Sequence, residues 1–239
     1  MKYIYGPINS RRLGSSLGIS LTPHKVCNFD CLYCQLGKTS QKFLERKEYY
    51  KIDEIIAEVN SWMANNLEAA KGLNFITLSG SGEPTLNSGI GLLIDFLKKI
   101  IKVPIAVITN SSLLGDPSVR RQILGADLIV PSLDAVTEDA FVKINQPGPG
   151  IKLEEIIEGL VSLRREFKGK IWLEVMLVKG VNDNLAHSRR LKETIERINP
   201  DRVQLNSPVR YTAQEGIETV DAKHLEKIKE LLGDKCEVI

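Results

Sequence analysis

The chain lacks a long hydrophobic run, a strong net charge and a surplus of cysteine. Its longest apolar stretches, such as residues 76–78 and 105–108, fall far short of the roughly 20 residues that a membrane-spanning helix needs. The first 14 residues contain no continuous apolar segment followed by a small-residue cleavage site, as a secretory signal would. The sequence therefore predicts a cytoplasmic protein without a membrane partner.

The low counts of charge and cysteine exclude two further classes. The formal net charge is only +2, which does not indicate a dedicated nucleic-acid binder. Three of the four cysteines fall within eight residues, so they cannot form a disulfide framework. The 239 residues show no internal repeat or convincing linker, and we expect a single domain with a core at about 15–207 and a C-terminal extension at 208–239.

Short apolar runs alternate with amphipathic segments along the chain. A continuous apolar run is typical of a parallel strand covered on both faces, and the alternation is typical of βα units. Six units do not close an eightfold barrel, so we predict an α/β fold with a largely parallel sheet, either a partial (β/α)6 barrel or a doubly wound sheet, plus a C-terminal helix. The predicted strands are 17–21, 73–78, 103–108, 127–130, 171–178 and 202–205, and the predicted helices are 52–63, 90–97, 118–124, 153–163, 191–198 and 225–232.

The segment after the first of these strands carries the chemistry. Cys27, Cys31 and Cys34 form a C-x3-C-x2-C triplet. A four-iron cluster normally takes four thiolates, so three would leave one iron open to another ligand. Zinc is the structural alternative, and it would need a fourth protein ligand such as His24 or the distant Cys236. The spacing favours an iron–sulfur cluster over zinc.

Two motifs resemble those of the radical S-adenosylmethionine superfamily. The aromatic Tyr33 directly before Cys34 completes a C-x3-C-x-aromatic-C pattern, and the segment Ser79, Gly80, Ser81, Gly82, Glu83, Pro84 is similar to the Gly-Gly-Glu-Pro motif of that superfamily. Ser81 departs from the pattern, where a glycine is usual. The resemblance implies a [4Fe–4S] cluster on Cys27, Cys31 and Cys34, with S-adenosylmethionine chelating the fourth iron.

The resemblance also implies roles for residues at the ends of other strands. Residues 79–83 would meet the methionine amino group, partly through backbone carbonyls. Asn110 and Ser132 would hydrogen-bond the methionine or ribose, or else cap helices. Glu174 would point into the barrel lumen towards a ribose hydroxyl or a lysine, and Leu205 would flank adenine unless it only packs in the core. Arg11 and Arg12 could pair with a carboxylate or phosphate, but we read them as solvated, and we read Asp134 as a helix cap.

The implied activity is reductive cleavage of S-adenosylmethionine to a 5′-deoxyadenosyl radical that abstracts hydrogen from an unknown substrate. The implied partner is an electron donor such as a flavodoxin or ferredoxin, and the substrate could be a metabolite, RNA or protein. Shorter stretches around residues 6–14, 34–37 and 204–208 look like a family of small iron–sulfur oxidoreductases labelled by analogy with wybutosine synthesis. Activation of a glycyl-radical enzyme, tRNA modification and a non-catalytic zinc or iron–sulfur binding module are the alternatives.

Overall fold

A computed structural model describes all 239 residues and contains one eight-stranded sheet whose strands are ordered as in the chain. The first two strands form an antiparallel hairpin, and every later strand is parallel to its neighbour. The two edge strands do not pair with each other, so the curved sheet is a partial barrel. The strands are β1 (Ile4–Ser10), β2 (Gly14–Ser20), β3 (Phe75–Ser79), β4 (Ile105–Thr109), β5 (Leu128–Pro131), β6 (Lys170–Met176), β7 (Arg202–Asn206) and β8 (Cys236–Val238).

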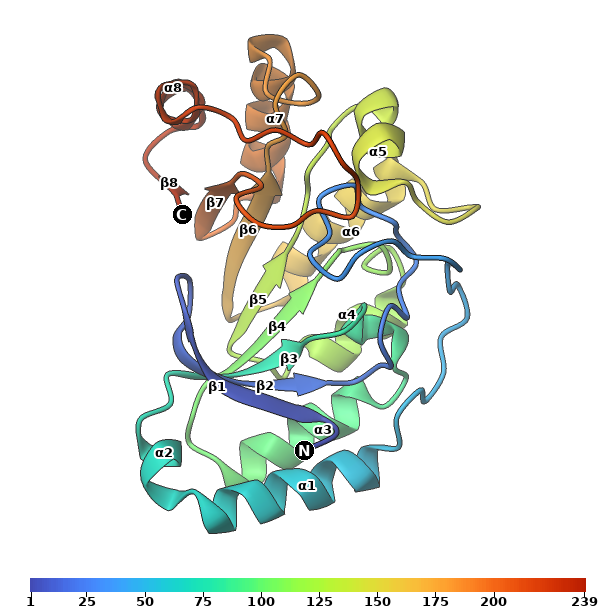
Figure 1. The fold of residues 1–239 in the computed structure, drawn as a ribbon, viewed down its shortest axis with the longest axis vertical. Helices are drawn as coiled ribbons and strands as arrows, with labels where there is room; N and C mark the ends of the chain where they lie inside the picture. The colour runs from blue at the N-terminus through green and yellow to red at the C-terminus, as the bar shows by residue number, and fades with distance from the viewer.

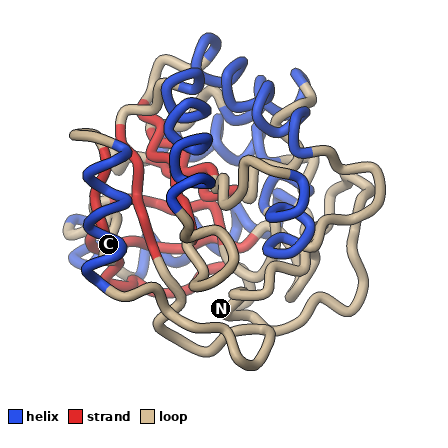
Figure 2. Tube along the Cα trace, turned by 90° about the horizontal axis from the view of Figure 1, so that it is seen from above, coloured by secondary structure: helices blue, strands red, loops and turns tan.

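The helices cover the outer face of this sheet. Figure 1 shows helices behind and below the strands, and in Figure 2 the strands lie inside a layer of helices, with long loops on the remaining side. No helix is both long and apolar enough to cross a bilayer. The helices are α1 (Ile52–Asn65), α2 (Leu67–Lys71), α3 (Ile90–Ile100), α4 (Pro117–Ile123), α5 (Glu138–Asn145), α6 (Leu153–Glu166), α7 (Leu185–Ile198) and α8 (Ala222–Leu232), with a short 3-10 turn at Pro84–Leu86.

The alternation of side chains along each strand separates two environments. On β3, for example, Ile76 and Leu78 are fully buried against the helices, while Thr77 and Ser79 face the interior of the partial barrel. The helix-facing side chains belong to a core of 48 residues. Inside the barrel a second, small apolar cluster surrounds Leu13, which comes from the tip of the β1–β2 hairpin. The hairpin therefore contributes to the barrel interior as well as to its edge.

The predicted fold class is confirmed, and the six predicted strands correspond to β2 through β7. The C-terminal helix is α8. The prediction of six strands was too low, because the sheet gains β1 at one edge and β8 at the other. β1 contains Gly6 and Pro7 and is largely exposed, and β8 has only three residues, so neither has the apolar pattern of a buried strand. The short, charged helix α5 was missed for a similar reason.

Candidate functional site

The three cysteines lie on the long loop between β2 and α1, at the carboxyl edge of the parallel strands. In Figure 1 this loop is the blue segment beside the arrowheads of β2 to β5. Two backbone hydrogen bonds join it to the turn after β3: the Lys25 amide donates to the carbonyl of Ser81 at 2.6 Å, and the Glu83 amide donates to the carbonyl of Val26 at 2.9 Å. The predicted cysteine loop and the predicted Ser79–Glu83 segment therefore form one structural unit.

Each cysteine sulfur has a hydrogen-bond donor close to it. Asn110 Nδ2 lies 3.5 Å from the sulfur of Cys27, and Lys25 Nζ lies 3.2 Å from the sulfur of Cys34. Asn145 Nδ2 is 3.5 Å from the sulfur of Cys31. Donors in these places stabilise negative charge on sulfur, which is the form that a metal centre binds. Asn145, at the end of α5, was missed by the sequence prediction.

Burial opposes the ionisation of two of the thiols. Burial raises the pKa of the Cys27 thiol to about 11 and holds the pKa of Cys31 above its usual range as well.

No three side chains of His, Cys, Asp or Glu converge on a point that could hold a single metal ion. A four-iron cluster takes its thiolates on separate iron atoms, so three thiols that do not converge are compatible with one.

Glu83 organises the turn after β3 from within the protein. Its carboxylate accepts four hydrogen bonds, from the amide and hydroxyl of Thr85, the hydroxyl of Thr109 and the amide of Asn110, at 2.5–3.0 Å. Glu83 as a whole is 2% exposed, and burial raises the pKa of its carboxyl group. Because its carboxylate is already engaged by Thr85, Thr109 and Asn110, Glu83 connects the turn to the end of β4 and shapes the loop around the cysteines.

The glycines of this turn are required by close backbone approach. A Cβ atom on Gly82 would lie 2.1 Å from the carbonyl oxygen of Val26 in the cysteine loop. Gly80 has φ +112°, and a Cβ there would meet the Ser20 side chain at 2.9 Å. Ser81 does not have a positive φ, so its backbone conformation is compatible with a side chain where a glycine is usual.

Asn110 and Ser132 both lie at the strand ends beside this unit. Asn110 Nδ2 also donates to Asn28 Oδ1 at 2.9 Å, which ties the end of β4 to the cysteine loop. The amide of Ser132 donates to the carbonyl of Thr109 at 2.9 Å. Neither residue caps a helix, since α4 begins after Asp116 and α5 after Thr137. The capping alternative is therefore wrong for both.

Asp134 is a buried acceptor, and the prediction that it caps a helix is wrong. Its carboxylate accepts from the Tyr33 hydroxyl at 2.5 Å, from Asn145 Nδ2 at 2.7 Å and from the Met176 amide at 2.9 Å. Burial raises its pKa to about 6. Asp134 thus holds the hydroxyl of Tyr33, a residue predicted as part of the motif. The Asp134 carboxylate also orients the side-chain amide of Asn145, which reaches the sulfur of Cys31.

The interior of the partial barrel holds a cavity of about 430 Å³ that reaches the cysteine loop. Tyr33 and Cys34 line it from that loop, and Ser79 lines it from the end of β3. Glu174 lies in its wall, as predicted, and its partner is Arg12 rather than a lysine. The prediction that Arg12 is solvated is therefore wrong, whereas Arg11 is exposed.

Leu205 lies on the opposite face of its strand from this cavity. Its side chain is fully buried in the helix-facing core, while the next residue, Asn206, lines the cavity and reaches Glu174 Oε1 at 3.4 Å. The surroundings of Leu205 are those of the core-packing alternative. The two-residue period of the strand gives this result directly, because residues 204 and 206 face the interior while residues 203 and 205 face the helices.

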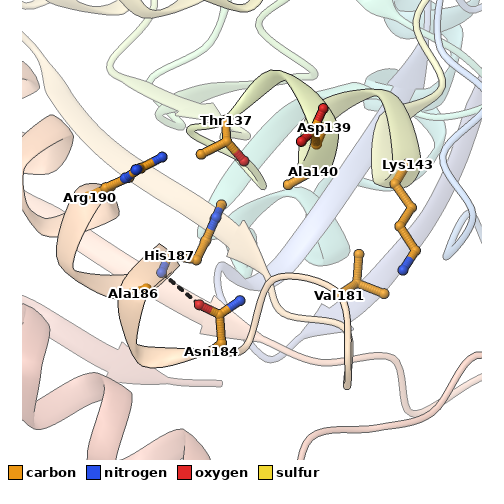
Figure 3. A pocket seen from close by; sticks show the side chains of 9 residues that line it. All are labelled: Thr137, Asp139, Ala140, Lys143, Val181, Asn184, Ala186, His187 and Arg190. Atoms are coloured by element: carbon orange, nitrogen blue, oxygen red, sulfur yellow. Dashed lines mark hydrogen bonds between the residues drawn. The ribbon is translucent and has the colours of Figure 1, made fainter.

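A second cavity, of about 310 Å³, lies between α5 and the first turn of α7. Figure 3 shows Lys143 and Asp139 of α5 on one side, with Arg190 and His187 of α7 on the other. Asn184 caps α7 there by accepting from the His187 amide at 2.9 Å. None of the predicted site residues lines this cavity, so we place the functional site in the interior cavity beside Cys34.

The chain is similar to known proteins over most of its length. The model of the Radical SAM superfamily matches residues 21–191. A UPF0026 protein of Methanocaldococcus jannaschii is 33% identical over 236 residues, which cover 98% of this chain and 72% of that protein. A protein of Brachyspira hyodysenteriae named GTPase Obg is 40% identical over 237 residues, 99% of this chain but 34% of that protein, so the chain spans about a third of its length.

A radical SAM methyltransferase from Sphaerobacter thermophilus has a similar fold, with a TM-score of 0.70 at 18% identity, covering 94% of this chain and 65% of that one. The family match begins at Leu21, directly after β2, and includes the cysteine loop and the turn that holds it. The chain belongs to the radical SAM superfamily, whose members are enzymes that use a [4Fe–4S] cluster and S-adenosylmethionine.

Proposed function

We propose that this chain binds a [4Fe–4S] cluster through Cys27, Cys31 and Cys34 and cleaves S-adenosylmethionine to generate a radical that acts on a substrate in the interior cavity. The observation that carries the proposal is that Cys34 belongs to the cysteine triplet and also lines the 430 Å³ cavity. A cofactor bound at the triplet would therefore lie at the wall of this cavity. Such a wall matters because a carbon radical must be kept from water and stray donors.

A cluster held by Cys27, Cys31 and Cys34 would supply one electron from an external reductant for the cleavage of S-adenosylmethionine to methionine and a 5′-deoxyadenosyl radical, which would abstract hydrogen from the substrate. The chain contributes the placement of these groups. Asn110, Asn145 and Lys25 donate towards the three sulfurs and so favour their ionised form.

The turn after β3 supplies the contacts for the methionine end of the cofactor. Glu83 holds the turn in place. The backbone carbonyls of the turn, between Ser79 and Gly82, are the acceptors that we assign to the methionine amino group. Asn110 and Ser132 lie at the adjoining strand ends, where polar side chains can orient the rest of the cofactor. Glu174, paired with Arg12, lies in the cavity wall and is the carboxylate that we assign to a ribose hydroxyl.

Anaerobic reconstitution with iron and sulfide tests this proposal. We expect the reconstituted protein to bind about four iron and four sulfide per chain. Reduction in the presence of S-adenosylmethionine should then release 5′-deoxyadenosine, measured by chromatography. The Cys31→Ala variant should lose both the cluster and the product, because it removes one of three ligands.

The matched control is Cys236→Ala. Cys236 is a buried cysteine of β8, outside the loop and the cavity, and its substitution should leave iron content and product formation unchanged. Binding of one zinc ion without product would instead support the non-catalytic module. Product formation by Cys31→Ala at the level of the unchanged protein would contradict the ligand assignment. A flavodoxin or ferredoxin in place of a chemical reductant would test the proposed electron donor.

A further inference from the structure

We infer that the interior cavity binds a small anionic substrate, one that carries a phosphate or carboxylate group, and that Arg11 and Arg210 hold this group. The inference rests on the proposed function and adds a substrate class to it. The wall of the cavity carries more positive than negative side chains. Three arginines line the cavity, Arg11, Arg12 and Arg210, whereas Glu174 is the one carboxylate among the lining residues.

The one acidic group is already neutralised from within the protein. Arg12 forms an ion pair with Glu174, and both side chains are largely buried, with 23% and 11% of their surface exposed. Asn206 reaches the other oxygen of the same carboxylate. Arg12 and Glu174 therefore cancel each other, and their pair leaves no acidic group in the cavity wall for the remaining arginines.

Arg11 and Arg210 have no acidic partner. Neither guanidinium group has a carboxylate oxygen within 4.0 Å, although the chain forms 13 other ion pairs. The two residues come from distant parts of the sequence, the tip of the β1–β2 hairpin and the loop after β7, yet they line one cavity. Two unpaired guanidinium groups in one concave surface attract an anion, and each offers the planar fork that matches a phosphate or carboxylate.

The location suits a substrate anchor. Cys34 and Gln35 line the same cavity. An anion held by Arg11 and Arg210 would therefore share this cavity with a cofactor bound at the cysteines. An anchoring group away from the reacting carbon fixes the orientation in which a hydrogen atom is presented. The cavity has a volume of about 430 Å³, within the range of small-molecule sites, and in the proposed function it also takes the ribose of the cofactor, so the remaining space favours a metabolite over a macromolecule.

The experiment uses the reconstituted protein loaded with S-adenosylmethionine and measures anion binding by calorimetry at low ionic strength. Inorganic phosphate and succinate are the probes, each against chloride at matched ionic strength, and they distinguish a phosphate site from a carboxylate site. We expect saturable binding of one of them. The Arg11→Gln and Arg210→Gln variants should each weaken it about tenfold, as expected for the loss of one charge-assisted contact.

Arg165→Gln is the matched control, because Arg165 is an exposed and unpaired arginine on α6, away from the cavity. It should bind the probe as the unchanged protein does. Absence of saturable binding of both probes, or equal weakening in the control, would overturn the inference. A single-stranded RNA oligonucleotide that binds with the same arginine dependence while phosphate and succinate do not would overturn the small-molecule assignment.

Two further outcomes separate this inference from the proposed function. If Arg11→Gln or Arg210→Gln weakens S-adenosylmethionine binding and leaves anion binding unchanged, the arginine serves the cofactor carboxylate and the substrate assignment fails. Formation of 5′-deoxyadenosine without anion binding would leave the proposed function standing and remove the substrate class. Anion binding by a protein that forms no cluster would contradict the proposed function and leave the anion site standing.

Discussion

At the scale of single residues, the site depends on how closely two backbones approach. Gly82 faces the cysteine loop with no room for a side chain, and the adjacent amide of Glu83 donates into that same loop. These contacts fix the position of the cysteine loop relative to the end of β3. They explain why a glycine at this position matters for the cysteines, although Gly82 itself carries no functional group.

We expect Gly82→Ala to prevent correct assembly of the cysteine loop. Its Cβ would lie 2.1 Å from the Val26 carbonyl oxygen, so the two segments must separate. The cost in unfolding free energy should be about 1–3 kcal/mol, and the reconstituted iron content should fall by at least half. Chemical denaturation and iron analysis measure the two effects.

Gly72→Ala is the control for this substitution. An added Cβ at Gly72 has only an ordinary contact, 3.6 Å from the Ala69 carbonyl oxygen, and the residue has φ −86°. This variant should retain its iron and its stability. If Gly82→Ala retains both as well, the close approach does not position the cysteine loop.

The residues that the sequence could identify are those whose identity is tied to chemistry. The three cysteines and Tyr33 could be predicted as site residues because their spacing is specific. Asn145 and the role of Asp134 were not predictable, because each acts through a partner far away in the chain: Asn145 reaches Cys31, and Asp134 joins Tyr33, Asn145 and β6. Asparagine is also common at the end of a helix, so Asn145 could not be distinguished from an ordinary helix-ending residue.

At the scale of elements, β1 and the turn that joins it to β2 are a part of the fold that the sequence analysis did not predict. Six parallel strands could be predicted because each is a continuous apolar run. The hairpin crosses into the barrel interior instead, where Leu13 packs with Ala106, Leu128 and Val130 and Arg12 meets Glu174 of β6. Its polar and glycine-rich sequence reflects that position at the wall of a cavity.

We expect the Arg12–Glu174 pair to stabilise the hairpin against β6. Replacing Arg12 with Met leaves the Glu174 carboxylate largely buried without its cation, and the unfolding free energy should fall by about 2 kcal/mol. A double-mutant cycle with Glu174→Gln, followed by chemical denaturation, isolates the coupling between the two side chains.

The exposed pair Arg197–Glu158 provides the comparison, since about half of each side chain is exposed. The same cycle there should give no more than about 1 kcal/mol. A coupling energy at Arg12–Glu174 no larger than that of the surface pair would mean that the ion pair does not hold the hairpin in place.

At the scale of the whole molecule, the cysteine loop is the least regular part of a well-packed fold. Residues 21–51 contain no helix or strand, yet they carry the three cysteines. A bound cluster would stabilise this loop by joining three of its residues, since a ligand that binds only the folded state adds to stability by mass action.

We therefore expect removal of the cluster to open the loop before the rest of the protein. Limited trypsin digestion of the metal-free protein should cut first at the exposed Lys38 or Lys47, while the reconstituted protein resists cleavage there for at least several times longer. Mass spectrometry identifies the first site. First cleavage elsewhere, for example at the exposed Arg165 of α6, in both forms would contradict this expectation.

The partners of the cysteine loop have a consequence for how the protein is made. Donors and acceptors that hold the three cysteines are spread along the chain, from Lys25 through Ser81 and Asn110 to Asn145. During synthesis the three thiols emerge early, directly after Lys25, and Asn145 emerges more than a hundred residues later. A ribosome-bound chain therefore cannot present the complete site that we propose for the cluster until α5 has been translated, and we expect insertion of iron and sulfide late in synthesis or after it.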